Sequence, residues 1–491
     1  MSLISFEFSA ISHAFVSVTM VSPLRHSYVT REGRDRVKRH TSPTKRLQDQ
    51  TCRARNDGAG LNMAERCRTR LSPELQELLH TAARCADEAG VLVYAVGGFV
   101  RDLLLGVRNE DLDLTVEGDG VAFAQRLATA LGGISKEPSE FATAVVIAPD
   151  GHKIDVATAR RETYKHPAAL PMIEAGSIRD DLLRRDFSIN AMAFALNGPE
   201  AFMLLDWYSG MTDLSEGVIR VLHNRSFRDD PTRMFRAIRL EQRFGFILHP
   251  HTQRLLHRAV EKHWIALLSG ARLWRELRLM LEGESPVRCL ERLHELQVLP
   301  QIDAALTLSS AQVAVLTRVA EARVQLVELV PERPLRAWLI YVAALVQELN
   351  PEAIRRICQR LALSARVAEE LIGGIAAVEV ACKRLQGQDD LRPSEVVAVL
   401  RTLPFELLPL LLARCPAMAV RDRVRQYLTT WRHVRPSLTG DDLKRFGIPQ
   451  GPEIGRLLAR LLAVKLDGQA PTWEAEEAWV RGAVGQRREM S

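Results

Sequence analysis

The sequence predicts an α+β protein, in which a small domain with a mixed sheet is followed by a long, all-helical region. Two observations lead to this fold class. Between residues 71 and 213, short runs with strand periodicity alternate with amphipathic helical patterns. From residue 214 onward, apolar residues recur at helical spacing almost without interruption. The expected breaks carry proline or glycine and lie at Gly283–Pro286, Pro331–Pro334, Pro351, Pro404 and Pro436. The breaks divide the helical region into residues 214–285 and 286–491.

The first domain is expected to begin with a helix over Pro73–Ala89. Ser72 can cap this helix, Pro73 suits its first position, and Gly90 can end it. The following residues alternate between strand and helix patterns. The predicted elements are a strand at Leu92–Val96, a turn at Gly97–Gly98, a helix at Val100–Leu105, a strand at Leu112–Val116 and a helix at Val121–Leu131. Two further strands, Ala144–Ala148 and Lys153–Ala157, flank the turn signal PDGH, which predicts a hairpin.

The positive charge of the chain is unevenly distributed. The formal net charge is +6, but residues 31–70 alone hold twelve Lys/Arg and five Asp/Glu. The remainder is nearly neutral, which excludes a uniformly basic nucleic-acid-binding protein and leaves room only for local basic patches. Three interpretations of residues 1–62 stay open: a disordered extension, a start placed too early with Met63 as the true initiator, and a transit peptide.

Cysteine usage and hydropathy indicate the compartment. The seven cysteines are widely spread and form no CxxC pair, so neither a zinc site nor a disulfide framework is expected. This pattern fits a reducing, cytoplasmic environment. No window of about 18 uninterrupted apolar residues occurs, so no membrane association is expected.

The segment EDLDLTV places two carboxylates on one face of a predicted strand. Asp111 and Asp113 are separated by one residue and therefore project together, while Leu112 and Leu114 face a core. Two adjacent carboxylates repel each other unless a cation lies between them, and Mg²⁺ prefers such oxygen ligands. A third carboxylate, Asp155, lies on the second strand of the predicted hairpin. Beside the pair, it could complete a two-metal site and accept the proton of an attacking hydroxyl.

The residues that precede this pair suggest phosphate binding. Gly97 and Gly98 allow a tight turn and a close approach of the backbone to a ligand, and the following helix offers free N–H groups to an anion. Arg101 lies in the first turn of that helix and can contact two phosphate oxygens at once. A phosphate site next to a metal-binding carboxylate pair is what a nucleoside triphosphate with Mg²⁺ requires.

Three motifs together carry a resemblance to a known family. They are GGFVRDLLLG followed by EDLDL, RDDLLRRDFSINAMA over residues 179–193, and DDPTRMFRAIRLEQRFGF over residues 229–246. This set resembles the nucleotidyltransferase superfamily in its branch of class II tRNA nucleotidyltransferases and bacterial poly(A) polymerases. Asp229 stands where that family usually has glutamate, and Leu240 where it has an aromatic residue. The resemblance is strong over residues 71–285 and weaker at Leu438–Leu462, which is similar to the family's terminal RNA-binding helices.

The resemblance implies a nucleotidyltransferase head domain followed by a helical neck, body and tail. It implies Mg²⁺ as cofactor, held by Asp111 and Asp113, and tRNA, ATP and CTP as partners, with no obligate protein partner. It also implies that Arg185, Arg236 and Arg239 contact the triphosphate. Asp186 and Asn190 are expected to orient these arginine side chains rather than to take part in the reaction.

Two residues of the third motif are candidates for reading the base. Asp230 and Arg233 are spaced i, i+3, so on a helix they would share one face. Cytosine and adenine both present an amino donor beside a ring-nitrogen acceptor, which an aspartate and an arginine can satisfy together. Guanine and uracil present a carbonyl and an N–H instead, and unpaired buried polar groups discriminate strongly against them.

The leading hypothesis is therefore a template-independent enzyme that adds C and/or A to the 3′ end of tRNA. Addition of CCA, of A alone and of CC alone share all of these motifs. The segment Thr163–Ser177, a candidate for the element that switches from C to A, argues against a CC-only enzyme. A bacterial poly(A) polymerase is the alternative enzyme. The intact Asp111, Asp113 and Asp155 argue against a catalytically silent RNA-binding protein, and the long helical region argues against an enzyme for small molecules.

Overall fold

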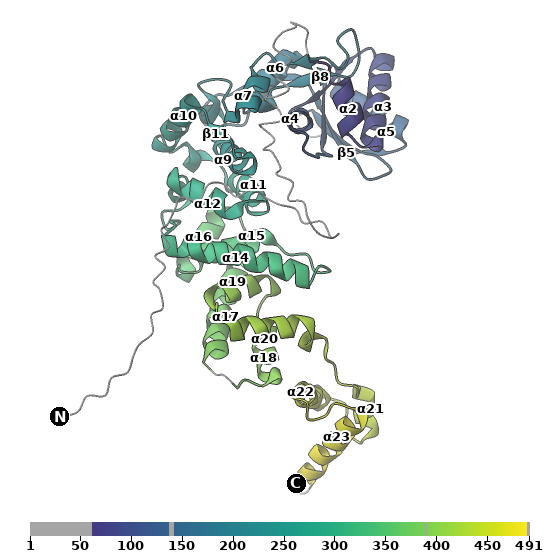
Figure 1. Cartoon of the computed structure of the whole chain (residues 1–491), viewed down its shortest axis with the longest axis vertical. Helices are drawn as coiled ribbons and strands as arrows, with labels where there is room; N and C mark the ends of the chain where they lie inside the picture. Colours follow the sequence, from purple (N-terminus) through teal and green to yellow (C-terminus); the bar gives the residue numbers. More distant parts are fainter. Residues whose placement is uncertain (1–60, 137–141, 388–389, 489–491) are drawn as a thin grey trace, which may run out of the picture.

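The computed structural model describes residues 61–136, 142–387 and 390–488. It shows an elongated molecule in which a mixed α/β domain lies at one end and layers of helices follow along the long axis (Figure 1). We call residues 61–217 the head, 218–285 the neck, 286–435 the body and 436–488 the tail. The predicted α+β class is confirmed. Of the predicted N-terminal extension, residues 1–60 lie outside the described part.

The head is built on a seven-stranded sheet with the order β3-β4-β5-β2-β1-β8-β9. Its strands are β1 (Leu92–Val96), β2 (Leu112–Glu117), β3 (Ile134–Ser135), β4 (Thr143–Ile147), β5 (Lys153–Thr158), β8 (Ala193–Ala195) and β9 (Leu204–Leu205). The β2–β5 pair is parallel, and the other neighbours are antiparallel. The predicted hairpin is therefore confirmed as β4–β5. The parallel pair matters most, because it brings the two carboxylate-bearing strands side by side.

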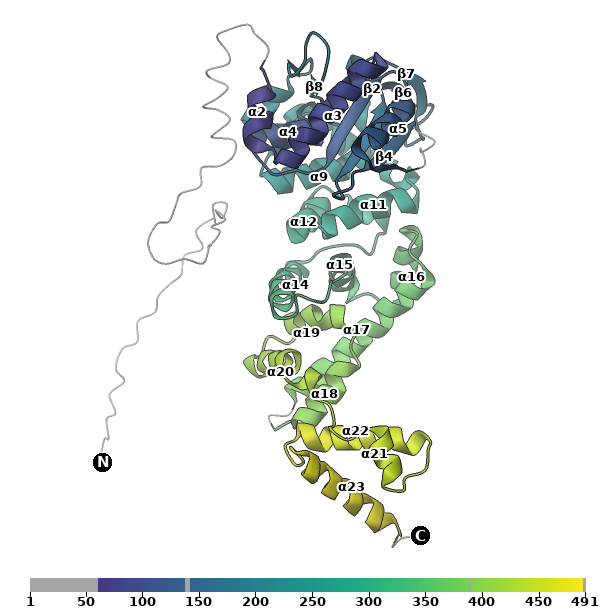
Figure 2. The ribbon, with the colours of Figure 1, turned by 90° about the vertical axis from the view of Figure 1, so that its right-hand side faces the viewer.

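The two faces of the head sheet are covered differently. Helices α3 (Pro73–Ala89) and α5 (Gly120–Leu131) pack on one face, where alternate strand residues such as Val93, Leu112 and Leu114 join the main core (Figure 2). Helix α6 (Ile178–Leu183) packs on the opposite face. That face holds a smaller apolar cluster, made of Tyr94, Val96, Ile178, Leu182, Ala191, Ala193 and Ala195. Because strand residues alternate, the odd-numbered residues of β2 and β5 point toward the α6 side.

The predicted elements of the head agree closely with the structure. Helix α3 begins and ends as expected, with the Ser72 hydroxyl accepting from the Leu75 N–H and Gly90 in the left-handed conformation. Helix α4 spans Gly98–Leu105 and starts two residues earlier than predicted, because Gly97 itself acts as the N-cap. Three head helices were not predicted, because six or seven residues are too few to show a helical period. They are α2 (Ala64–Arg70), α6 (Ile178–Leu183) and α7 (Gly210–Glu216).

Removing α2 is expected to destabilise the head. Met63 and Cys67 are buried in the main core, and the Arg70 guanidinium donates to the carbonyls of Leu103 and Leu104 at the end of α4. A chain that begins at Pro73 should lose about 2–4 kcal/mol of unfolding free energy. Urea unfolding followed by circular dichroism measures this. A chain that begins at residue 61 is the control, and equal midpoints for the two chains would contradict the structural role of α2.

The helical region follows the predicted breaks. The neck contains α8 (Ser226–Asp229), α9 (Thr232–Phe244), α10 (Pro250–Glu261) and α11 (Gly270–Leu281), with a short β10–β11 pair (Val218–Ile219 and Ile247–Leu248). The body contains α12 (Pro286–Glu295), α13 (Leu299–Ile302), α14 (Ser310–Leu329), α15 (Ala337–Val346), α16 (Pro351–Arg360), α17 (Ala365–Gln386), α18 (Pro393–Arg401), α19 (Leu408–Arg414) and α20 (Met418–Thr429). The predicted end of the first domain, residue 213, falls within α7 (Gly210–Glu216).

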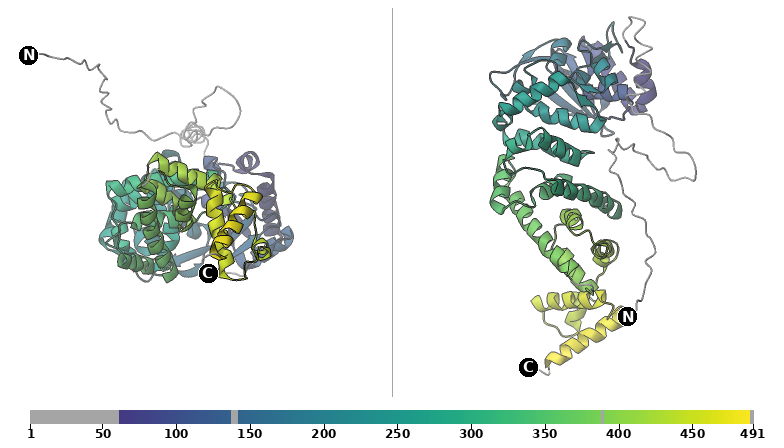
Figure 3. Two further views of the ribbon diagram at one scale, coloured as in Figure 1. Left: turned by 90° about the horizontal axis from the view of Figure 1, so that it is seen from below. Right: turned by 60° about the vertical axis from the view of Figure 1, so that its left-hand side comes forward.

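The main core of the head continues through the neck and the body, whereas the tail has a core of its own. Trp274 of α11 meets Trp338 of α15 edge to face, with 5.0 Å between the ring centroids. The tail helices α21 (Gly440–Arg445), α22 (Pro452–Leu466) and α23 (Trp473–Arg488) surround a separate cluster around Leu443 and Leu461. Seen along the long axis, these helices lie within the outline of the layers behind them (Figure 3). The stretch expected to be helical, Leu438–Leu462, contains α21 and most of α22.

One expectation about cysteine needs correction. The structure joins Cys382 of α17 to Cys415, which follows α19, as a disulfide, with 6.0 Å between their Cα atoms. The 33-residue separation gave no sign of this pairing in the sequence. The other described cysteines are free and buried, at positions 67, 85, 289 and 358. Within the described ranges, no single helix is long and apolar enough to cross a membrane. One helix pair bent by 106°, Pro393–Arg401 with Phe405–Arg414, meets the length and composition criteria only jointly.

Candidate active site between the head and the neck

The parallel strands β2 and β5 place two of the predicted carboxylates side by side. Asp113 pairs in register with Asp155, and both point toward the α6 side of the sheet, since their neighbours Leu112, Ile154 and Val156 are buried in the main core. Burial raises the pKa of Asp113 to about 6, and repulsion by Asp155 and Asp111 adds to the rise. Burial and Asp111 also raise the pKa of Asp155. The site thus holds unneutralised negative charge.

This raised pKa predicts that Asp113 opposes folding near neutral pH. The folded state binds the Asp113 proton more tightly than the unfolded chain does, so stability falls as the pH rises from about 4 to about 6, and the loss is complete above that range. Asp113→Asn should therefore stabilise the metal-free protein at pH 7.5 by about 1–2 kcal/mol, allowing for partial solvent exposure. The gain should vanish at pH 4.

Thermal melts in EDTA at both pH values test this expectation. Glu110→Gln, which removes an exposed carboxylate from the residues just before β2, is the matched control. A gain of the same size at both pH values, or in the control, would show that local charge around Asp113 is not the cause.

The carboxylates of Asp111 and Asp113 suit a cation that is also coordinated by water and by phosphate oxygens. Asp111 is exposed and lies just before β2, whereas Asp113 is half-buried on the strand. Within the described ranges, no three His, Cys, Asp or Glu side chains converge as a closed metal site. A pair of carboxylates with open positions is nevertheless what Mg²⁺ uses at phosphate-transfer sites, and cation binding would relieve the repulsion among these groups.

The glycine turn lies directly beside this carboxylate pair. Gly97 has a φ of 70°, and a Cβ atom there would collide with the Nη1 atom of Arg185. The turn must therefore be glycine, both for its backbone conformation and for the close approach of a guanidinium. Arg185 donates to Asp181 at 3.0 Å, and its Nε atom is buried without a hydrogen-bond partner among the described residues. Its positive charge opposes the rise in the pKa of Asp113.

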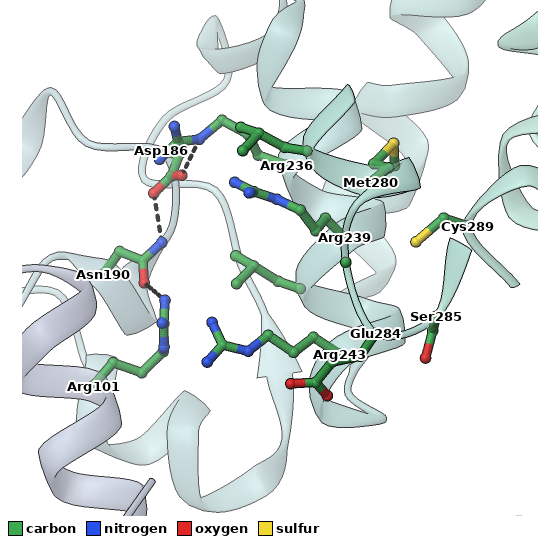
Figure 4. A pocket seen from close by; sticks show the side chains of 13 residues that line it. Arg101, Asp186, Asn190, Arg236, Arg239, Arg243, Met280, Glu284, Ser285 and Cys289 are labelled. Carbon is green, nitrogen blue, oxygen red and sulfur yellow. Dashed lines mark hydrogen bonds and ion pairs between the residues drawn. The ribbon is translucent and has the colours of Figure 1, made fainter. Parts of the chain in front are cut away.

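Arg101 is more enclosed than the sequence suggested. Its guanidinium is buried and bonds to Asp102 through Nε at 2.8 Å and to the Asn190 side-chain oxygen through Nη1 at 2.5 Å. Asn190 in turn donates to Asp186 at 2.9 Å, and Asp186 accepts from Arg236 Nε at 2.7 Å (Figure 4). This chain of contacts ties α4 of the head to α9 of the neck. It agrees with the expected framework role of Asp186 and Asn190.

Asp186 is the charged centre of this framework. Although burial opposes its ionisation, Arg236 and the hydrogen bond from Asn190 hold the pKa of Asp186 well below its usual range. The same pairing raises the pKa of Arg236. The contact between head and neck is therefore an ion pair with a fixed charge at neutral pH.

A cavity of about 520 Å³ lies between the head and the neck. Its lining combines one of the predicted catalytic carboxylates with most of the predicted nucleotide-binding residues. From that set it includes Gly98, Arg101, Asp113, Arg185, Asp230, Arg233 and Arg236. Its volume is within the range of small-molecule sites, and its lining is rich in arginine, which suits an anionic ligand such as a triphosphate.

Asp230 and Arg233 both line this cavity, but not as one helical face. Asp230 lies in extended backbone before α9, and its carboxylate accepts from Thr232 and, at 2.8 Å, from Arg272. Arg233 lies in the first turn of α9 and is buried. It donates to the Ser226 hydroxyl at 2.8 Å and to the Arg184 carbonyl at 2.6 Å. The expected shared helical face is wrong because Pro231 is the N-cap of α9 and the helix begins at Thr232, two residues after Asp230.

Arg239 does not reach the cavity that holds Asp113. It lines a second cavity of about 300 Å³, which shares only part of its wall with the first. The helix α9 explains the difference. Arg236 and Arg239 are about one turn apart, so the second of them lies farther along the helix axis.

Sequence reasoning missed several residues that shape the site. Arg272 of α11 donates to Asp230 and, at 2.7 Å, to the carbonyl of Ala168. It thereby connects the predicted base-reading residue to the segment between β6 (Arg160–Thr163) and β7 (Met172–Ala175). The remaining missed residues that line the cavity are Arg160, Glu162, Arg184 and Arg275. Tyr164 and Pro171, which also line it, belong to the candidate switching segment Thr163–Ser177. No periodic or motif signal marks Arg272, because it lies 42 residues from its partner.

Comparison with protein families gives two matches. The family described as the poly A polymerase head domain matches residues 93–220. The family described as a probable RNA and SrmB-binding site of polymerase A matches residues 245–306. These ranges cover most of the head, part of the neck and the start of the body. The cavity of about 520 Å³ is lined by residues of both ranges and by Asp230, Arg233 and Arg236, which lie between them.

Individual proteins extend the likeness over most of the chain. The A-adding tRNA nucleotidyltransferase of Geobacter sulfurreducens is 40% identical over 403 residues, which is 81% of this chain but only 46% of that protein. The enzyme of the same name from Halalkalibacterium halodurans is 33% identical, over 77% of this chain and 85% of its own length. The solved structure of the Thermotoga maritima CCA-adding enzyme complexed with tRNA has a TM-score of 0.71 at 29% identity, covering 87% of this chain and all of that one.

Proposed function

This chain belongs to the family of tRNA nucleotidyltransferases, and we propose that it adds nucleotides to the 3′ end of tRNA, using ATP and CTP with Mg²⁺. One observation carries the proposal. The in-register pair Asp113–Asp155 adjoins the arginine-lined cavity between head and neck, which Asp113 itself lines. This arrangement can hold a triphosphate against the carboxylates that activate an attacking hydroxyl.

Addition of the terminal A alone is the activity that the relatives favour. Three curated relatives that match at least 75% of this chain carry the name A-adding tRNA nucleotidyltransferase. Addition of the complete CCA end is the second candidate, because the likeness to the Thermotoga maritima CCA-adding enzyme covers 87% of this chain and all of that one. Poly(A) synthesis is the third candidate, because both matching family models carry polymerase A in their descriptions.

The chemistry follows from the positions of three side chains. The 3′ hydroxyl of the RNA attacks the α-phosphorus of the triphosphate, a new O–P bond forms, and pyrophosphate leaves. Asp155, whose pKa is raised by burial, accepts the hydroxyl proton. Arg185, held over Gly97, neutralises charge that builds up on the phosphate oxygens. When bound at Asp111 and Asp113, Mg²⁺ would supply a Lewis acid and shield the phosphate charge.

Selection of the base is assigned to the neck side of the same cavity. Asp230 offers a carboxylate to an exocyclic amino group, and Arg233 offers N–H donors to a ring nitrogen. Arg272 holds the Asp230 carboxylate in place through a 2.8 Å ion pair. The chain selects C and A over G and U on this basis, because each wrong base leaves both of these groups unpaired.

A matrix of RNA acceptors and nucleotides tests the proposal. The acceptors are tRNA ending before the first C, after C and after CC, together with an A-tailed oligonucleotide, each with ATP or CTP alone. An A-adding enzyme extends only the tRNA ending in CC, by one nucleotide, with ATP. A CCA-adding enzyme also extends the shorter tRNAs with CTP. Repeated addition of A to the oligonucleotide would overturn the tRNA assignment in favour of a poly(A) polymerase.

A further inference from the structure

The second cavity lies behind the wall of the nucleotide cavity. It is enclosed by α9, by the end of α11 and the start of α12, and by Arg101 and Asn190 of the head (Figure 4). Four residues line both cavities, namely Arg101, Asp186, Asn190 and Arg236. The second cavity contains neither Asp113 nor the base-reading pair Asp230 and Arg233. It is therefore not part of the triphosphate or base site.

The charge inside this cavity is not balanced by its own side chains. Four arginines line it, at positions 101, 236, 239 and 243, against two carboxylates, at positions 186 and 284. Arg101 and Arg236 are held by Asn190, Asp102 and Asp186, as described above. In the described part of the chain, the Arg239 guanidinium forms no hydrogen bond or ion pair. Burial lowers the pKa of Arg239, and the charge of Glu276 opposes this shift.

Arg243 is also only loosely held. Its closest carboxylate oxygen, on Asp102, is 3.7 Å away, and the same carboxylate already pairs with Arg101. Its guanidinium rests over the ring of Phe244, 4.8 Å from the centroid. Its side chain is 38% exposed, so it can turn toward a ligand that enters from solvent. Arg239 and Arg243 are spaced i, i+4 on α9 and present their donors to the same space (Figure 4).

Apolar side chains form the rest of the wall. Leu240, Leu279, Met280 and Cys289 line it beside the arginines. Guanidinium donors next to an apolar surface match a nucleotide unit, which has an anionic phosphate and a flat apolar base. A free phosphate ion would use the donors but not the apolar wall.

We propose that this cavity binds a phosphodiester of the RNA acceptor strand through Arg239 and Arg243, one or two nucleotides before the reacting 3′ end. The proposal rests on the proposed function. The 3′ hydroxyl must reach Asp155 while the triphosphate occupies the larger cavity, so the preceding nucleotides need a separate anchor next to it. The shared wall places this second cavity immediately beside the reaction site.

Arg239→Gln and Arg243→Gln, singly and together, test the assignment. KM values for tRNA ending in CC and for ATP are measured separately, together with the dissociation constant of the tRNA as a function of KCl. The double variant should raise the acceptor KM by about 10-fold or more and change the KM for ATP far less. The logarithm of the tRNA dissociation constant should rise less steeply with log[KCl] in the variant. The slope should be smaller by roughly 0.7 for each phosphate that the variant no longer neutralises. Arg258→Gln, which removes an exposed charge from α10 of the neck, is the matched control.

A neutral methylphosphonate at each of the last two linkages of the tRNA identifies the phosphate. At the correct linkage it should weaken wild-type binding about as much as the double variant does, and it should weaken the variant no further. Inhibition by pyrophosphate tests whether the cavity binds this product instead of an RNA phosphodiester. A raised inhibition constant for pyrophosphate, with an unchanged acceptor KM, would overturn the proposal in favour of a product site.

The two proposals fail in different ways. If the wild-type protein extends no acceptor, the proposed function fails. If it is active and both glutamine variants keep the wild-type acceptor KM and salt slope, the assignment of the second cavity fails. Arg239→Lys guards against loss of folding, since it retains the charge and should keep most of the salt slope.

Discussion

Asp113→Ala is expected to lower nucleotide transfer by at least about 10³-fold while tRNA binding changes only a few-fold. Asp113 is the half-buried member of the carboxylate group, lies in register with Asp155, and lines the nucleotide cavity. Its loss removes one of two predicted Mg²⁺ ligands, and metal assistance contributes several kcal/mol at about 1.4 kcal/mol per tenfold in rate. Because Asp113 opposes folding at neutral pH, the variant should not unfold. Single-turnover rates at saturating ATP and tRNA measure the loss.

Two further variants show which role each carboxylate has. Asp111→Ala should cause a loss of similar size that excess Mn²⁺ partly restores, since a ligand removed from a metal site weakens metal binding. Asp155→Asn should lose activity that no metal concentration restores, because it removes the proton acceptor. Asp119→Ala, at the exposed N-cap of α5, is the control. Turnover near the wild-type rate in Asp113→Ala, with an unchanged circular dichroism spectrum, would refute the metal-site assignment.

The head could be predicted from the sequence because its signals are local. Ser72, Pro73 and Gly90 fix α3 through capping contacts within a few residues, and alternation of apolar residues fixes β2 and β5. The pairing of β2 with β5 is different. It joins strands about 40 residues apart, and only the hypothesis of a third carboxylate pointed to it. Helix α2 was missed because its stability comes from Met63 and Cys67 packing against the distant α4, not from its own period.

The candidate site was predictable in composition but not in geometry. The first motif contains Asp111, Asp113 and the glycine turn, and the predicted hairpin strand contains Asp155. The structure places Asp113 and Asp155 on the expected strands and Asp111 just before β2. The i, i+3 spacing of Asp230 and Arg233 led to a wrong expectation, because spacing identifies a helical face only if both residues are within the helix. Arg239 was grouped with Arg236 through the family resemblance. Both lie within α9, but they are one helical turn apart, and Arg239 lines only the second cavity. Arg272 is held by contacts with Asp230 and Ala168, which no single-sequence pattern encodes.

Arg233→Ala is expected to change base choice and not only the rate. Incorporation of A, or of C if CTP is used, should fall by about 10- to 150-fold, since a charged hydrogen bond contributes roughly 1.5–3 kcal/mol. Incorporation of U and G should fall less, because these bases gain nothing from the arginine donor. Single-nucleotide incorporation from each of the four triphosphates on one tRNA acceptor measures both effects.

The hydrogen bonds of Arg233 make a positioning role the strongest competing explanation. Its Nη1 and Nη2 atoms already donate to Ser226 and to the Arg184 carbonyl, so the substitution also loosens the segment that carries Arg185 and Asp186. Ser226→Ala separates the two roles. It removes one positioning contact but leaves the Arg233 donors in the cavity, so all four rates should fall by one modest factor and the A-to-U and A-to-G ratios should not change. If Arg233→Ala also lowers all four rates by a common factor, Arg233 shapes the cavity, and base selection lies with Asp230 and its Arg272 partner.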